Sequence, residues 1–180
     1  MKFLYLFIYL FALLSAQESI SGIPHSFTDS KLQTINFIEM PEVDLDELLI
    51  EDENAAPGTP FRYGKIFYVD YNLNNSGTWE VLGDGSRLWR LEIHSKGAFS
   101  IGIEYDYFHL PERAEFYVYN PNQENVLGAY SALNNQEDYL FATPLVKGDV
   151  IILEYYEPYD AEFEGEIYLS EVIHDYRDIM

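Results

Sequence analysis

The side chains that could carry catalysis are few and lie far apart along the chain. The four histidines are His25, His94, His109 and His174, and the 180 residues include no cysteine. A serine hydrolase needs a hydroxyl nucleophile, an imidazole within hydrogen-bond reach and a carboxylate that orients the ring. His94 follows Glu92 on an alternating segment and His109 precedes a proline turn, which is typical of surface positions. We therefore expect no catalytic residue in this chain.

Metal and cofactor motifs are also missing from the sequence. It contains no thiolate ligand for zinc, no His-Glu-x-x-His pattern and no Gly-x-Gly-x-x-Gly or Walker pattern. The densest acidic segment, residues 44–53, lacks the glycine that an EF-hand loop needs at its sixth position. We expect neither a bound metal nor a cofactor.

Composition and charge restrict the class of protein further. Hydrophobic residues make up 48% of the chain and aromatic residues 17%, which is typical of a packed domain. The 31 acidic and 10 basic side chains give a net charge of −21. Such a surface repels phosphate backbones, so we expect no nucleic-acid partner.

The N-terminus predicts export from the cell. Lys2 precedes an unbroken apolar run at residues 3–14, and small residues follow at 15–16. This run is too short to span a bilayer and matches a secretory signal, cleaved after Ala16. We expect a secreted protein, extracellular or periplasmic in a bacterium, with no membrane contact after cleavage. A buried or membrane-anchoring first helix is the alternative interpretation.

Residues 17–60 are predicted to form an irregular leader around one short helix. Asp44 can cap this helix, Glu47 stands three residues later as in a capping box, and leucines at 45, 48 and 49 share one face. Turn-forming residues at 19–24 and 54–60 favour connectors on either side. The acidic side chains are interpreted as a solvated helix face.

From residue 61 to 177 the apolar period changes to two, which predicts strands. Residues 99–107 show it clearly, with Phe99, Ile101, Ile103, Tyr105 and Tyr107 expected on one face. Because no long helical segment separates the strands, we expect an antiparallel β-sandwich of jelly-roll-like type. The eight predicted strands are 65–71, 78–82, 88–94, 99–107, 114–119, 126–131, 149–156 and 164–173.

Two strand features predict details of the sandwich. Gly83-Asp84-Gly85 is a hairpin signal, which places Trp79 and Trp89 on neighbouring strands. We interpret this pair as core, with a sugar-stacking platform as the alternative. Residues 150–156 are apolar on both faces, so this strand is expected near the centre of a sheet.

Several blocks of the chain form an ordered set of strand and turn motifs. They are NSGTW at 75–79, GSRLWRL at 85–91, LPERAEFYVYN at 110–120, LGAY at 127–130, FATP at 141–144, VKGD at 146–149, IILEYYEP at 151–158 and HDYR at 174–177. In this order the blocks resemble the N-terminal pro-region of secreted trypsin-like serine peptidases of the lysyl endopeptidase type. The leader segment at residues 39–44 agrees with this resemblance.

This resemblance implies a non-catalytic module, which is expected to be a truncated or a stand-alone copy of such a pro-region. In those peptidases the protease domain follows the region, and none of its catalytic residues can be placed on this sequence. The module is expected to act on a trypsin-like protease domain as a folding aid, inhibitor or docking unit.

The alternative hypothesis is an extracellular adhesion or carbohydrate-binding module. The chain has sixteen tyrosines, and tyrosine rings on outward strand faces can stack on a polysaccharide. The candidate binding residues are Tyr117, Tyr119, Tyr156 and Tyr168.

Overall fold

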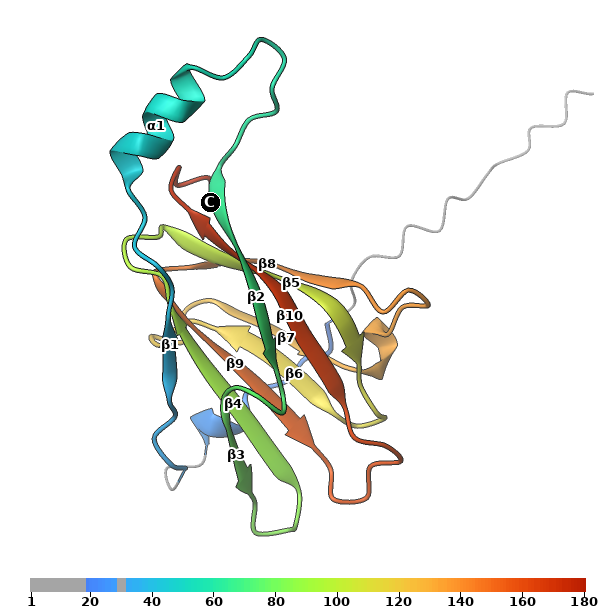
Figure 1. The fold of residues 1–180 in the computed structure, drawn as a ribbon. Coiled ribbons are helices and arrows are strands. Elements are labelled where there is room, and N and C mark those ends of the chain that lie inside the picture. Colours follow the sequence, from blue (N-terminus) through green and yellow to red (C-terminus); the bar gives the residue numbers. More distant parts are fainter. Residues whose placement is uncertain (1–18, 29–31) are drawn as a thin grey trace, which may run out of the picture.

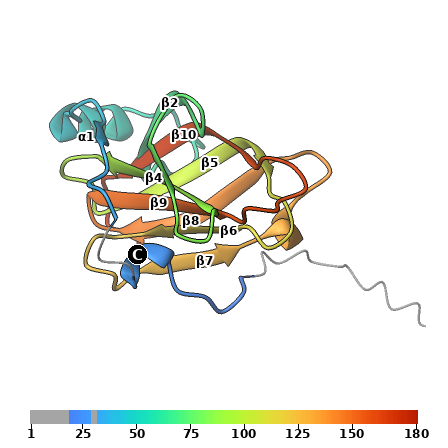
Figure 2. The same ribbon diagram turned by 90° about the horizontal axis from the view of Figure 1, so that it is seen from below.

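The computed structural model describes residues 19–28 and 32–180, which form two β-sheets packed face to face (Figures 1 and 2). The expected all-β sandwich is confirmed in this coarse form. The predicted signal segment, residues 1–16, lies outside the described residues. Within the described residues, no helix combines the length and the apolar character that crossing a membrane would require.

The larger sheet is built mainly from antiparallel pairs and has β9 in a central position. Its order is β1-β4-β9-β6-β7, with β3 also paired to β4. The central position expected for residues 150–156 is confirmed. The strands are β1 (Phe37–Glu39), β3 (Thr78–Val81), β4 (Arg87–His94), β6 (Glu115–Tyr119), β7 (Val126–Tyr130) and β9 (Val150–Glu157).

The smaller sheet has the order β2-β10-β5-β8 and is antiparallel throughout. Its strands are β2 (Gly64–Asn72), β5 (Ser100–His109), β8 (Phe141–Lys147) and β10 (Glu166–Asp175). From β4 onward the chain crosses repeatedly between the two sheets, so residues distant in sequence meet in one core.

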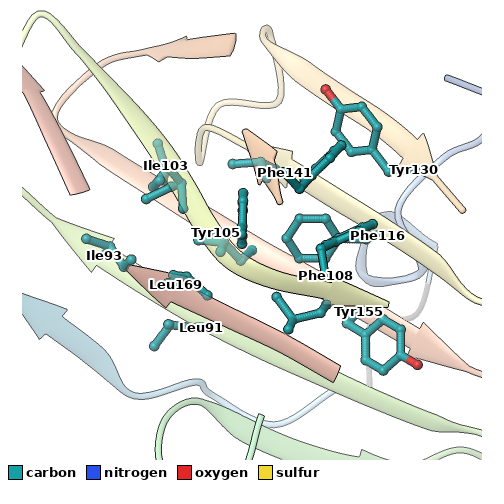
Figure 3. Close-up of a cluster of buried hydrophobic side chains, with 14 of the residues drawn as sticks. Leu91, Ile93, Ile103, Tyr105, Phe108, Phe116, Tyr130, Phe141, Tyr155 and Leu169 are labelled. Carbon is teal, nitrogen blue, oxygen red and sulfur yellow. The ribbon is translucent and has the colours of Figure 1, made fainter. Parts of the chain in front are cut away.

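Aromatic rings fill much of the space between the sheets (Figure 3). Phe108 and Phe141 stack with ring centroids 4.1 Å apart, and Tyr105 packs edge-on against Phe116. Trp89 is fully buried in this core, and its register partner Trp79 packs against it from a partly buried position. The core interpretation of the tryptophan pair is therefore confirmed.

The eight predicted strands all occur, but the sequence prediction missed β1 and β8. β1 has three residues, too few to show an alternating pattern. β8 contains Pro144, which lowers strand propensity. The expectation of purely antiparallel pairing is also wrong at one place, because β1 pairs with β4 in parallel.

The leader packs closely against the sandwich. Met40 enters the main core, and Ile20 exchanges two 3.0 Å backbone hydrogen bonds with Ala129 on the edge strand β7. Helix α1 (Leu45–Glu53) begins at Asp44, whose carboxylate accepts the Glu47 backbone N–H, as predicted. A short 3₁₀ turn, η1 (His25–Phe27), crosses the outer face of the larger sheet.

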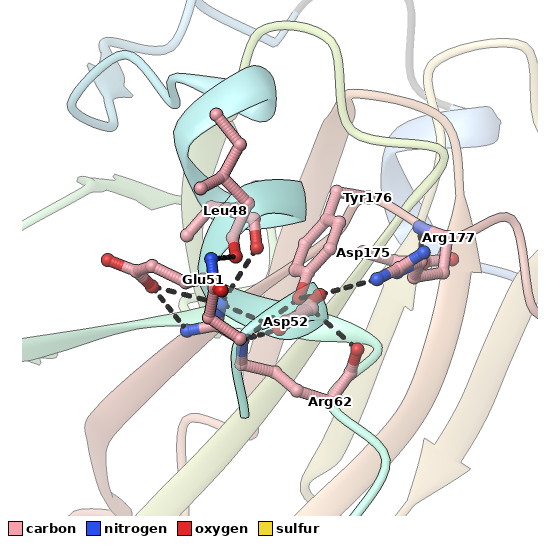
Figure 4. A network of polar contacts seen from close by, with 9 residues as sticks. Leu48, Glu51, Asp52, Arg62, Asp175, Tyr176 and Arg177 are labelled. Carbon is pink, nitrogen blue, oxygen red and sulfur yellow. Dashed lines mark hydrogen bonds and ion pairs between the residues drawn. The ribbon is translucent and has the colours of Figure 1, made fainter. Parts of the chain in front are cut away.

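A polar network fixes α1 to the end of the sandwich (Figure 4). The Arg62 guanidinium donates to Glu51, Asp52 and the Leu48 carbonyl oxygen. The Arg177 guanidinium reaches the same Asp52 carboxylate at 2.5 Å. Since Leu48 is the one residue of α1 that is buried, these polar contacts supply much of the attachment.

Candidate functional site

The leader covers a set of polar side chains on the outer face of the larger sheet. Glu154 on β9 is completely buried, and its carboxylate accepts hydrogen bonds from the Tyr119 hydroxyl at 2.8 Å and the Ser26 backbone N–H at 3.2 Å. The Ser26 and Tyr119 hydroxyls also lie 2.8 Å apart. Burial, and then the negative charge of Glu154, raise the pKa of Tyr119. The Tyr119 hydroxyl therefore stays protonated and donates.

A buried ion pair lies on the strands beside this cluster. The Arg90 guanidinium donates to the Glu80 carboxylate at 2.5 Å and to the Gln33 carbonyl oxygen at 2.7 Å. Glu80 in turn accepts the Gln33 backbone N–H. Both ion-pair side chains are about nine-tenths buried, and Gln33 belongs to the leader. Breaking such a pair by removing one partner is costly because it leaves a buried charge.

Tyr117 and Tyr156 complete the covered face. The Tyr117 hydroxyl donates to Glu115 at 2.9 Å, and the Tyr156 ring stacks on His25 with centroids 4.1 Å apart. Burial, and then the adjacent Glu115, raise the pKa of Tyr117. The Tyr156 hydroxyl lies 3.0 Å from that of Ser86.

Three of the four candidate tyrosines are thus brought together, but two of them are not exposed. Tyr117 has no exposed surface and Tyr119 has 3%, because Phe27 and other residues pack over them. Tyr156 is half-buried. The sequence correctly indicated an outward strand face for these residues. It was wrong about their accessibility, since the alternation pattern carries no information about a distant segment folding over that face.

The fourth candidate, Tyr168, lies on the other side of the molecule in a row of rings that we call the aromatic strip. The strip runs over the outer face of β5 and β10 and includes a residue from each adjoining loop. Neighbouring ring centroids are 4.5 to 5.8 Å apart. Its members, in order, are Phe163, His109, Tyr139, Tyr107 and Tyr168.

A β-bulge explains why the sequence pattern missed Tyr107. On β5, Tyr105 and Tyr107 pair with the consecutive residues Leu169 and Tyr168 of β10, so β5 carries one extra residue. This insertion reverses the alternation. Phe108 enters the core and Tyr107 turns outward, so the expected inward position of Tyr107 is wrong. Phe99 is also misplaced, since it precedes β5 and is 47% exposed.

Carboxylates border the aromatic strip. Glu171 on β10 pairs with Glu104 on β5, next to the ring row, and burial together with the Glu104 charge raises the pKa of Glu171. Glu166 lies beside Tyr107, where partial burial and the Glu166 charge raise the tyrosine pKa. The strip therefore combines aromatic rings with hydrogen-bond acceptors.

His174 lies beside a serine hydroxyl in the buried interior. The Ser95 hydroxyl lies 2.8 Å from Nδ1 of His174, but the two residues are 1% and 3% exposed. The nearby Asp175 carboxylate instead accepts the Ser100 hydroxyl. Across the described residues, no group of three or more His, Cys, Asp and Glu side chains is arranged to hold a metal ion.

Exposed apolar side chains gather around α1. We call this region the α1-end surface and define it by Leu45, Phe61, Phe99 and Arg177. Phe61 and Arg177 line an open pocket of about 640 Å³, with the Arg177 guanidinium 5.8 Å from the Phe61 ring centroid. Leu45, Phe99 and Tyr176 line a second, smaller pocket. The exposed fractions are 72% for Phe61, 43% for Leu45 and 47% for Phe99.

No family model matches the chain, and no solved structure matches its fold.

Proposed function

We propose that this chain is a secreted, non-catalytic, jelly-roll-like domain that binds a trypsin-like protease domain through its α1-end surface. The sequence blocks that resemble the peptidase pro-region support the partner. They fall in order on β3, β4, β6, β7, β8, β9 and the end of β10. Residues 1–16 are proposed to direct export.

The α1-end surface carries this proposal. In the resembled peptidases the protease domain follows the block matched by residues 174–177, and here that block ends beside α1, where Tyr176 and Arg177 contact Asp52. The surface offers large apolar side chains and an arginine, which are typical of the centre of protein interfaces. Surrounding acidic residues, such as Glu51 and Glu53, would favour a basic partner.

Binding to a purified protease domain of the lysyl endopeptidase type tests the proposal. We expect saturable association by biolayer interferometry, together with inhibition of the protease or a higher yield of refolded protease. The double variant Leu45→Ala/Phe61→Ala should weaken association roughly tenfold or more. Val81→Ala is the matched control, because Val81 is 76% exposed on β3 and is not part of the α1-end surface.

The outcome distinguishes a specific interface from general acidity. No association and no effect on protease refolding would show that the proposed partner is wrong. Equal weakening by Val81→Ala would show that the α1-end surface is not the interface. A fluorophosphonate probe should leave the chain unlabelled, because Ser95, the hydroxyl beside an imidazole, is buried.

A further inference from the structure

We propose that the aromatic strip on the smaller sheet is a binding site for a neutral polysaccharide. This site is separate from the α1-end surface and does not depend on a protease partner. The strip combines two chemical features that recognise sugars, namely aromatic rings in a row and carboxylates along the side of that row.

The rings are arranged as a continuous row rather than as isolated surface residues. His109 and Phe163 stack at 4.6 Å, and Tyr107 and Tyr139 stack at 4.5 Å. Edge-on contacts join the two stacks and add Tyr168 at the end. Tyr139 and Phe163 are each 38% exposed, and Tyr68 on the neighbouring strand β2 is 81% exposed. The exposed parts of these rings can contact successive apolar faces along a sugar chain.

The backbone of Tyr139 supplies independent support for function. Its φ is 61°, in the left-handed region that favours glycine or asparagine. The Tyr139 carbonyl oxygen accepts the Phe108 backbone N–H at 2.9 Å, which holds this strained conformation against β5. Strained non-glycine residues are enriched at ligand-binding sites. Here a residue with a large ring, stacked on Tyr107, has a backbone conformation that a glycine would adopt more easily.

Charge identifies the class of sugar. Glu104, Glu166 and Glu171 border the rings and can accept hydrogen bonds from sugar hydroxyls. The same carboxylates, and the net charge of −21, repel uronic acids and sulfated chains. A neutral sugar polymer donates hydrogen bonds to these carboxylates, stacks on the rings and carries no negative charge for them to repel.

Affinity electrophoresis through gels containing cellulose derivatives, β-1,3-glucan, mannan, xylan or amylose tests the site. We expect at least one neutral polymer to retard the wild-type chain. Tyr107→Ala should weaken that retardation roughly tenfold, as expected for the loss of one stacked ring. Tyr159→Ala is the matched control, because Tyr159 is 72% exposed but has no ring contact with the strip.

Tyr139→Asn separates binding from folding. Asparagine tolerates positive φ, so this variant should unfold at the same or a higher urea concentration than wild type while losing polysaccharide retardation. Absence of retardation by every neutral polymer would overturn the proposal. So would equal retardation of wild type and the folded Tyr107→Ala and Tyr139→Asn variants, or stronger binding to an anionic polymer such as alginate.

Discussion

The Asp52 carboxylate accepts a 2.7 Å hydrogen bond from the Tyr176 hydroxyl, although the two residues are 124 positions apart in sequence. This contact joins the leader helix to the residue that directly follows the last strand. It explains how a short, strongly acidic helix with one buried residue is held against the sandwich. The leader and the sandwich should therefore lose structure together.

Asp52→Asn should destabilise the chain and weaken its acid sensitivity. The Tyr176 hydrogen bond, together with the Arg177 and Arg62 guanidinium groups, lowers the pKa of Asp52 below its ordinary value of 3.8. The stabilisation is therefore present above pH 3.8 and is lost as the pH falls through the lower folded value. Thermal unfolding followed by circular dichroism between pH 5 and pH 2 measures this difference.

Glu53→Gln provides the control for Asp52, because it removes a charge from the next, exposed position of α1. The control should keep the wild-type profile. A profile for Asp52→Asn that runs parallel to that of wild type would show that the Asp52 network contributes nothing to acid sensitivity.

His174→Asn should reduce the loss of stability that the wild-type chain shows as the pH falls from 7 to 5. Burial lowers the pKa of His174 from 6.5, although the charges of Asp175 and Asp149 oppose this shift. Below pH 6.5 the unfolded chain takes up a proton that the folded chain resists, so wild-type stability falls as the pH decreases. Urea unfolding at several pH values measures the slope.

Asparagine at position 174 keeps a polar atom near the Ser95 hydroxyl, so packing changes are kept small. An unchanged slope in His174→Asn would contradict the assignment of this acid sensitivity to His174.

Gly77→Ala should destabilise the chain by at least about 2 kcal/mol. Gly77 has a φ of +71°, and an added Cβ would lie 2.5 Å from the buried Trp89 ring and 2.7 Å from the Arg90 carbonyl oxygen. Gly83→Ala, in the following hairpin, meets no atom within 4 Å and should change stability little. Urea unfolding of both variants makes the comparison, and similar stabilities would contradict the close approach at Gly77.

Tyr119→Phe should release the leader from the outer face. The substitution removes the hydroxyl that donates to the buried Glu154 and lies beside Ser26, at a cost of about 1–3 kcal/mol. We expect faster thermolysin cleavage within residues 19–28, detected by mass spectrometry. Tyr156→Phe is the control, since the Tyr156 hydroxyl contacts Ser86 in the loop between β3 and β4 and not the leader. Equal cleavage of the two variants would contradict a specific role for Tyr119.

The sequence determined the local structure of this chain. Short apolar segments predict eight of the strands, and most of these segments alternate because a sheet with one buried face requires a period of two. Asp44 and Glu47 predict the start of the helix, and Gly83-Asp84-Gly85 predicts the hairpin, because capping and turn geometry depend on neighbouring residues.

Tertiary structure decided which side chains are accessible to solvent and which side chains contact one another. The same alternation describes Tyr119 and Tyr168, yet the leader buries the first and the second remains part of an open strip. A bulge on β5 turned Tyr107 outward, and a loop brought Tyr139 onto it. These outcomes depend on contacts between distant segments, whereas periodicity reports only the local direction of each side chain along its own strand.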